Sequence, residues 1–271
     1  MNFMRENRKG SDMRKKNKVK PLTVIKKIAR YLNDISKHCS TSAVILAGGK
    51  SVRMDNVSKQ LIDICGKPVI IHSALAFEKC DEISEIIIVC SPQEQPIIEE
   101  QIKKHNITKF KGFAVGGETR FESSKNGFLA VNPKSELVAI HDAARCLITP
   151  ENICNVIKMA KKHGAAIAAT PSIDTVKIVD ESGLIKTTVD RKNVWNAQTP
   201  QVFIKPMIEV GLFYEREKDF LPTDDSMLIE TLGFKVCPVD CGRDNIKITY
   251  PSDVEFARTI LSKRKGDHDE I

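Results

Sequence analysis

Short apolar runs that alternate with helix-like segments constrain the fold of this chain more than any other feature. Strands are predicted over residues 43–47, 85–90, 112–115, 137–141 and 165–171, and the helices between them begin near Pro68 or cover about 93–105, 119–131 and 150–163. Strands and helices that alternate at this spacing form parallel βαβ units. We therefore expect an α/β fold, a Rossmann-like three-layer sandwich with a mostly parallel sheet.

The alternation stops between about residues 173 and 201. In that stretch Val176 to Val179 and Ile185 to Val189 flank a Glu181-Ser182-Gly183 turn, a pattern typical of a β-hairpin. An isolated hairpin is only marginally stable in water. We expect this inserted arm, about residues 172–200, to pack on another element such as a second subunit. Beyond it we expect helices near 205–215, 224–232 and 252–263 and strands near 234–239 and 246–249.

The excess positive charge of the chain lies at its N-terminus. Residues 1–40 hold 12 of the 42 Lys and Arg and 3 of the 35 Asp and Glu, a net +9, so the other residues carry a net −2. A nucleic-acid-binding core concentrates positive charge on its own surface, so no nucleic-acid partner is expected. The sequence predicts a basic extension over 1–40, one catalytic domain over 41–264 and a tail over 265–271.

The extension itself divides into two parts. Residues 1–21 are polar and basic and are expected to be disordered. Residues 22–37 repeat apolar side chains at helical spacing, which predicts an amphipathic helix. Packing on the domain or on a partner subunit is the favoured role of this helix. Membrane-surface binding is the alternative, although the helix lacks the aromatic anchors that such helices favour.

Cysteine usage and hydropathy indicate the compartment. The chain has eight cysteines, no C-x-x-C pair, and several of the cysteines lie inside apolar runs, which predicts reduced, mostly buried thiols. No apolar stretch reaches the length of about 20 residues that a membrane span needs. The N-terminus has no apolar region of the secretory type. We therefore expect a cytoplasmic protein with no membrane span.

A glycine turn followed by two cations is the first candidate for chemistry. Gly48 and Gly49 follow the first predicted strand, where backbone N–H groups can bind an anion and where open parallel sheets bind ligands. Arg53 and Lys59 add the fixed positive charge that transfer at phosphorus requires. The spacing matches neither the P-loop nor the dinucleotide fingerprint.

The second candidate is the string His141-Asp142-Ala143-Ala144-Arg145, which follows a predicted buried strand. A carboxylate there is a plausible ligand for a hard cation such as Mg²⁺. The alternative is that Asp142 caps the next turn and pairs with Arg145. His141 is expected to have a structural role.

Three further strings place basic or hydroxyl side chains beside turns, where a phosphate can be held. They are Thr188–Arg191 with Trp195–Gln201, Pro222–Asp225, and Gly242–Thr249. Taken singly, each is more often a solvated turn.

In this order and spacing, the five segments resemble those of the 2-C-methyl-D-erythritol 4-phosphate cytidylyltransferase family of the non-mevalonate isoprenoid route, over about Ala43 to Leu261. The resemblance implies a fold of the nucleotide-diphospho-sugar transferase type. It implies transfer of CMP from CTP to a sugar-alcohol phosphate, with Mg²⁺ or another divalent cation as cofactor. It also implies a homodimer in which the hairpin arm is swapped between subunits.

The resemblance also assigns roles to residues. The implied catalytic residues are Arg53, Lys59, Arg191 and Lys247. The implied CTP-binding residues are Ala47, Gly48, Gly49, Gly117, Glu118, Ser123, Asp142, Ala143 and Arg145, with Asp142 as the metal ligand. The implied acceptor-binding residues are Thr175, Arg191, Thr199, Thr223 and Lys247, of which Thr175 and Arg191 would serve the neighbouring subunit's site.

The chain departs from the family pattern at several positions. Leu46, Ser58 and Cys146 stand where the family usually has proline, Gly48 where it has alanine, Ser51 where it has glycine and Glu118 where aspartate is common. Two other functions remain open at this point. One is a cytidylyltransferase for ribitol 5-phosphate or another sugar phosphate, and the other is a non-catalytic nucleotide-binding scaffold.

Overall fold

A computed structural model describes residues 39–48, 58–214 and 220–269 of the chain. The disordered segment expected over 1–21 and the amphipathic helix expected over 22–37 lie outside these residues.

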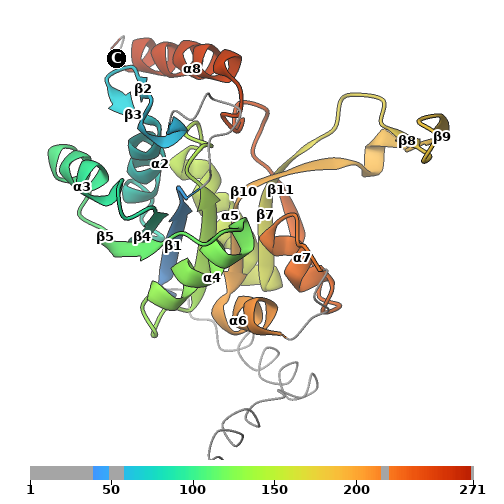
Figure 1. The fold of residues 1–271 in the computed structure, drawn as a ribbon, viewed down its shortest axis with the longest axis horizontal. Helices are drawn as coiled ribbons and strands as arrows, with labels where there is room; N and C mark the ends of the chain where they lie inside the picture. Colours follow the sequence, from blue (N-terminus) through green and yellow to red (C-terminus); the bar gives the residue numbers. More distant parts are fainter. Residues whose placement is uncertain (1–38, 49–57, 215–219, 270–271) are drawn as a thin grey trace, which may run out of the picture.

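A seven-stranded sheet with the order β11-β7-β10-β6-β1-β4-β5 forms the centre of the molecule (Figure 1). Its strands are β1 (Thr41–Leu46), β4 (Ile83–Cys90), β5 (Phe110–Val115), β6 (Leu137–Asp142), β7 (Ala165–Pro171), β10 (Trp195–Ile204) and β11 (Cys237–Asp240). Strand β10 runs antiparallel to both β6 and β7, and the other neighbouring strands are parallel. The expected mostly parallel sheet is confirmed.

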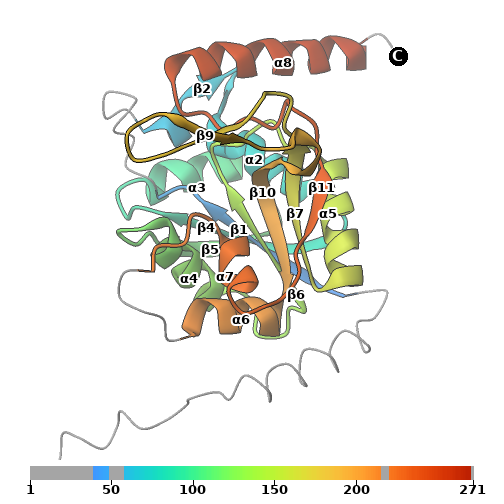
Figure 2. The same ribbon diagram turned by 90° about the vertical axis from the view of Figure 1, so that its right-hand side faces the viewer.

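Helices cover both faces of this sheet. One layer holds α2 (Val69–Glu78), α3 (Gln95–Lys104) and α5 (Pro150–His163), and the other holds α4 (Arg120–Ala130), α6 (Lys205–Phe213) and α7 (Asp225–Glu230). The C-terminal helix α8 (Pro251–Asp269) lies across the end of the molecule beside a short ribbon of β2 (Asp63–Ile64) and β3 (Lys67–Pro68) (Figures 1 and 2). The predicted three-layer sandwich is therefore confirmed.

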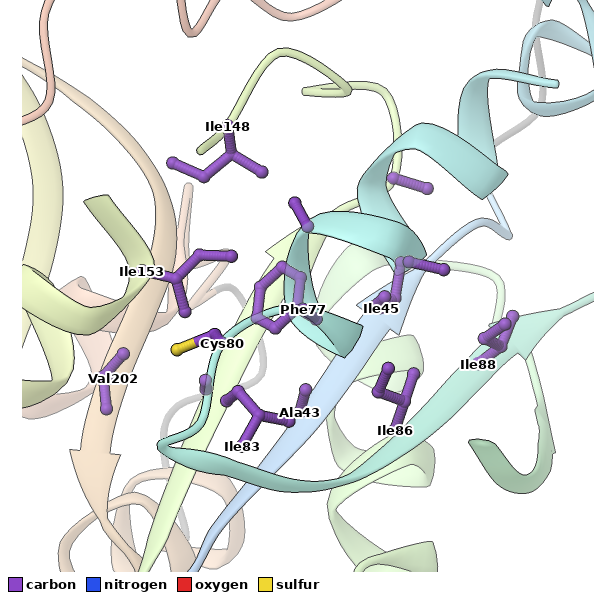
Figure 3. Close-up of a cluster of buried hydrophobic side chains, with 14 of the residues drawn as sticks. Ala43, Ile45, Phe77, Cys80, Ile83, Ile86, Ile88, Ile148, Ile153 and Val202 are labelled. Atoms are coloured by element: carbon purple, nitrogen blue, oxygen red, sulfur yellow. The ribbon is translucent and has the colours of Figure 1, made fainter. Parts of the chain in front are cut away.

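The alternation of side chains along β1 explains why its sequence is apolar throughout. Ala43 and Ile45 pack in the cluster that contains Phe77 of α2 (Figure 3), whereas Val44 and Leu46 pack in the cluster under α4, α6 and α7. A strand that is buried on both faces reads as a continuous apolar run.

Two predictions for the C-terminal half need correction. Residues 195–201, expected to complete the hairpin insertion, begin the long central strand β10. Residues 246–249 form no strand, because Ile248 donates one backbone hydrogen bond to Ala144 and its side chain is buried in a cluster beneath α8. Helix α8 continues to Asp269, so the tail predicted over residues 265–271 begins within this helix.

The inserted arm consists of β8 (Lys177–Val179) and β9 (Ile185–Thr188) and projects from the body of the domain (Figure 1). It carries apolar side chains into solvent, among them Leu184 and Ile185, which are 68% and 64% exposed. Within the described part of the chain, no helix combines the length and the apolar character that crossing a membrane requires.

Candidate active site

A cavity of about 240 Å³ opens at the carboxyl ends of β1 and β6. It is lined by Leu46, Gly48, Lys59, Gln60, Gly117, Glu118, Thr119, Arg120, Ser123, Asp142, Ala144 and Lys247. The carboxyl edge is where open parallel sheets bind their ligands. Seven of the residues implied by the resemblance to bind CTP or to act in catalysis therefore lie together: Gly48, Lys59, Gly117, Glu118, Ser123, Asp142 and Lys247.

Two glycines allow the backbones after β1 and β5 to touch at this edge. A Cβ atom added to Gly48 would lie 3.3 Å from the Cα of Gly116, and one added to Gly116 would lie 3.4 Å from the Cα of Gly48. Both distances are tighter than ordinary van der Waals contact. The departure at position 48, glycine in place of alanine, thus accompanies a close approach of two chains at the cavity wall.

The first turn of α4 forms the opposite wall. Thr119 and Glu122 make a capping box, in which each side chain binds the other residue's backbone N–H. Ser123 accepts a hydrogen bond from the backbone N–H of Gly117 (3.0 Å). A Cβ on Gly117 would lie 2.2 Å from the Cβ of Glu122, so the loop can close only with glycine there.

Lys59 reaches the cavity from a short 3-10 helix, Lys59–Leu61. The preceding Ser58 donates a hydrogen bond to the carboxylate of Glu94, which also accepts one from the Ser91 hydroxyl (2.8 Å). These bonds tie the turn that carries Lys59 to the end of β4. Gly49 and Arg53, the other predicted residues of this loop, lie outside the described residues.

Asp142 is the central charge of the site. Its Oδ1 accepts a hydrogen bond from Nε of Arg120 (3.1 Å), and its Oδ2 accepts one from Nζ of Lys247 (2.6 Å). Burial acts to raise the pKa of Asp142, but Arg120 and Lys247 overcome it and hold this pKa well below its usual range. The carboxylate is therefore ionised across the physiological pH range.

The donor set fits a magnesium ion that is bound together with a substrate. Among the described residues, no three His, Cys, Asp or Glu side chains gather into a metal cage. Mg²⁺ is commonly held by one or two carboxylates and the phosphate oxygens of a substrate, with water in its other positions. Asp142 at the cavity wall supplies one such carboxylate. The alternative expected from the sequence, an Asp142–Arg145 pair, is wrong, because the partners of Asp142 are Arg120 and Lys247.

Several predicted residues lie beside the cavity and support it. Arg145 donates to the backbone carbonyls of Asn245 (2.8 Å) and Ala197 (3.3 Å), so it joins the segments before α8 and at the start of β10. Ala47 and Ala143 are buried behind the wall. The Thr199 hydroxyl accepts from the backbone N–H of Asp142 (3.0 Å). Thr199 is buried, so in this chain it positions Asp142.

Three other predicted residues, Thr175, Arg191 and Thr223, do not line the cavity of their own chain. Thr175 and Arg191 are exposed on the arm, where Arg191 donates to the carbonyl of Ile173 (3.2 Å). Thr223 is exposed just before α7.

Sequence reasoning missed one prominent cation of the site, Arg120. It lies in the first turn of α4, and a Thr119-to-Glu122 capping box opens that helix. That box is recognisable in the sequence as Thr-x-x-Glu. It would have placed Arg120 beside the glycine loop at the carboxyl edge of the sheet.

His141 is buried and structural, as expected. Its ring packs against Phe77, with 5.0 Å between ring centroids, and its Nδ1 lies 3.1 Å from the Thr199 hydroxyl. Burial lowers the pKa of His141 to about 3, whereas an unfolded chain has a histidine pKa of about 6.5.

This shift predicts a pH-dependent stability. Below about pH 6.5 the histidine is protonated in the unfolded chain, whereas buried His141 stays neutral in the folded protein. The free energy of unfolding should therefore fall by about 1.4 kcal/mol per pH unit between about pH 6.5 and 3. His141→Asn keeps a hydrogen-bond acceptor for the Thr199 hydroxyl but cannot be protonated. The pH dependence of its free energy of unfolding, measured by urea denaturation over that range, should be smaller than that of wild type by about 1.4 kcal/mol per pH unit. The exposed His163→Asn serves as the control. Parallel curves for wild type and His141→Asn would contradict the prediction.

Comparisons with known proteins agree with this geometry. The family model described as 2-C-methyl-D-erythritol 4-phosphate cytidylyltransferase matches residues 41–263. The chain is 43% identical over 226 residues to the protein of that name from Caldanaerobacter subterraneus, covering 83% of this chain and 100% of the relative. It is 39% identical over 226 residues to the one from Syntrophus aciditrophicus, covering 83% and 97%.

Solved structures are similar as well. The 4-diphosphocytidyl-2C-methyl-D-erythritol synthase of Anaerococcus prevotii superposes with a TM-score of 0.75 at 33% identity, over 86% of this chain and 99% of the other. The 2-C-methyl-D-erythritol 4-phosphate cytidylyltransferase of Thermus thermophilus superposes with a TM-score of 0.66 at 25% identity, over 81% and 97%.

Proposed function

The chain belongs to the 2-C-methyl-D-erythritol 4-phosphate cytidylyltransferase family, and from this membership we propose that it transfers CMP from CTP to 2-C-methyl-D-erythritol 4-phosphate. The products are pyrophosphate and 4-diphosphocytidyl-2-C-methyl-D-erythritol. The observation that carries the proposal is the cavity at the carboxyl edge of the sheet, where Arg120 and Lys247 bind Asp142 and Lys59 lines the same cavity.

The reaction needs no nucleophile from the protein. An oxygen of the acceptor phosphate, already an anion at neutral pH, forms a bond to the α-phosphorus of CTP, and the bond from that phosphorus to the β-phosphate oxygen breaks. Catalysis then consists of positioning and charge stabilisation. Lys59, with Arg53, is assigned to the charge that builds on the phosphate oxygens. The loop at Gly117 and Glu118, held closed by Ser123, is assigned to the cytosine.

A divalent cation would be held by Asp142 and by the CTP phosphates. When bound, it would neutralise phosphate charge and help to orient the pyrophosphate leaving group. Lys247 is assigned to the phosphate of the acceptor, for which it would leave the carboxylate of Asp142. Its 40% exposure supports this assignment. Arg191 is assigned to the same phosphate from the arm.

The arm supports a homodimer. Ile178, Val179, Leu184 and Ile185 project into solvent from a ribbon of two short strands, which is marginally stable by itself. We propose that a second subunit covers these side chains, and that Thr175 and Arg191 enter the cavity of that subunit. The cytoplasmic location expected from the sequence stays a prediction.

Mixed dimers test the shared site. Lys59→Ala and Arg191→Ala should each be nearly inactive at low acceptor concentration, the second because its KM for the acceptor rises. When the two variants are unfolded, mixed equally and refolded, half of the dimers are heterodimers with one intact site in two, so about a quarter of the wild-type rate should return. Absence of recovery in a sample with confirmed heterodimers would contradict the swapped arm.

Pyrophosphate release tests the function itself. CTP, ATP, GTP and UTP should be compared with 2-C-methyl-D-erythritol 4-phosphate and with ribitol 5-phosphate as acceptors, in Mg²⁺ and in chelator. The proposal expects fast release with CTP, the methylerythritol acceptor and Mg²⁺ only. Preference for ribitol 5-phosphate would support the related transferase, and no release from any nucleotide would support a scaffold.

A further inference from the structure

Arg120, which lines the cavity, bridges two carboxylates. Its Nε donates to Oδ1 of Asp142 (3.1 Å) and its Nη1 donates to Oδ2 of Asp225 (2.7 Å). The side chain of Asp225 is 1% exposed and that of Arg120 is 26% exposed. The guanidinium of Arg120 therefore binds one carboxylate at the cavity wall and another in the protein interior.

Both ends of this bridge are fixed by local structure. Arg120 begins α4 directly after the capping box at Thr119. Asp225 begins α7, and the backbone N–H groups of Asp225 and Ser226 donate to Oε1 of Gln201 on β10 (3.0 and 2.9 Å). The Nε2 of Gln201 donates in turn to Asp224 (2.7 Å). Gln201, from the Thr-Pro-Gln string, thus binds both Asp224 and the backbone of Asp225. These hydrogen bonds hold the Asp225 carboxylate in place.

The two cations that contact Asp142 are held differently. Lys247 is 40% exposed at the cavity rim, whereas Arg120 is anchored on its far side by Asp225. Without the Asp225 carboxylate, the planar guanidinium is free to turn both of its donors onto Asp142, since arginine binds carboxylates bidentately. Such a pair would occupy both oxygens of Asp142 and reduce its ability to bind a cation.

We propose that Asp225 is a positioning residue that acts on Asp142 through Arg120. It holds the guanidinium so that only Nε touches Oδ1 of Asp142, and Oδ2 becomes available once Lys247 leaves it. The inference deepens the proposed function and rests on it, because it takes Asp142 as the ligand of the divalent cation. Groups that orient a metal ligand typically change metal affinity or activity by about 10- to 100-fold when they are removed.

The test is the affinity of the full chain for Mn²⁺, measured by water-proton relaxation in the presence of methylerythritol phosphate and α,β-methylene CTP, a CTP analogue that cannot release pyrophosphate. The acceptor is included because its phosphate draws Lys247 away from Oδ2 of Asp142. Asp225→Asn keeps the shape of the side chain and removes its charge, and it should weaken Mn²⁺ binding by about 10- to 100-fold. Arg120→Lys keeps the charge, but one ammonium group replaces the fork of donors, so it should weaken binding similarly. Glu82→Gln removes a carboxylate from the Lys161 ion pair (2.6 Å) at the opposite edge of the sheet and should leave the affinity unchanged.

The outcomes separate this inference from the proposed function. A folded Asp225→Asn protein with wild-type Mn²⁺ affinity would overturn the inference and leave the proposed function standing. If Asp225→Asn does not fold, as judged by circular dichroism, Arg120→Lys decides, and wild-type affinity in that variant overturns the inference. A wild-type protein that binds no Mn²⁺ in the presence of both ligands overturns both. A purely structural ion pair predicts lower unfolding temperatures for the variants with no change in Mn²⁺ affinity.

Discussion

Replacing Lys59 by alanine should lower kcat for CMP transfer by about 10²- to 10⁴-fold, with a modest change in CTP binding. The ammonium group lies on the cavity wall, on a turn tied to β4 through Ser58 and Glu94. Fixed charge of this kind costs little reorganisation during the reaction, so its largest effect is on the charge that develops in the transition state. Steady-state kinetics with CTP and methylerythritol phosphate, together with direct CTP titration, measure the two terms separately.

Lys67→Ala provides the matched control, because Lys67 lies on the nearby β3 and does not line the cavity. It should retain wild-type kcat. A Lys59→Ala enzyme with near-normal turnover would remove Lys59 from catalysis and would weaken the assignment of the cavity to the triphosphate.

Asp142→Asn should be the most damaging single change, lowering turnover by about 10³-fold or more at any Mg²⁺ concentration. Asparagine keeps the size of the side chain but removes the carboxylate that contacts Arg120 and Lys247. It also removes the proposed cation ligand. Because the pKa of Asp142 lies well below its usual range, wild-type activity between about pH 5 and 8 should show no loss from protonation of this carboxylate.

Glu99→Gln is the control for charge, since it removes one negative charge from the exposed Glu99–Lys103 pair on α3. Its Mg²⁺ dependence should match that of wild type. Recovery of Asp142→Asn activity at high Mg²⁺ would indicate that the carboxylate contributes affinity only, and an unchanged Mg²⁺ dependence would place the cation elsewhere.

The fold was predictable where periodicity and burial agree. Strands such as β1 and β4 are buried on both faces of the sheet, so they can be recognised in the sequence as apolar runs. Strand β10 was missed because its first seven residues, Trp195 to Gln201, include polar residues and a proline. Those residues serve the site: Thr199 contacts Asp142, and Gln201 caps α7. The alternating Ile246–Thr249 segment resembles a strand, but in the structure it packs beneath α8 and contacts Asp142 through Lys247.

The sequence motifs predicted many of the residues that form the site, but they did not predict which of these residues contact one another. Lys59, Asp142 and Lys247 lie on three separate segments, and the resemblance placed them together correctly. Arg120 has no string of its own, and its importance comes from two aspartates that are distant in sequence. Thr199 was expected to face the acceptor, but tertiary packing turns its hydroxyl to His141 and the backbone of Asp142.

Two departures from the family pattern also have a structural context. Cys146, in place of proline, is buried in the apolar cluster beneath α8 with Ile248 and Val254. Ser58, in place of proline, has a φ of −64°, which proline also adopts, and its hydroxyl adds the hydrogen bond to Glu94. The backbone at the Lys59 turn therefore keeps a proline-like conformation and gains a side-chain tether.

The oxygen atoms of the acceptor phosphate show whether the acceptor attacks the α-phosphorus of CTP directly. Methylerythritol phosphate labelled with ¹⁸O in its phosphate should be incubated with CTP, Mg²⁺ and the enzyme, and the products analysed by mass spectrometry and ³¹P NMR. In-line attack by the acceptor predicts that the label stays in the cytidine product, including the bridge between its two phosphorus atoms, and that pyrophosphate carries none. Labelled pyrophosphate, or CMP and pyrophosphate without a diphosphate product, would contradict it.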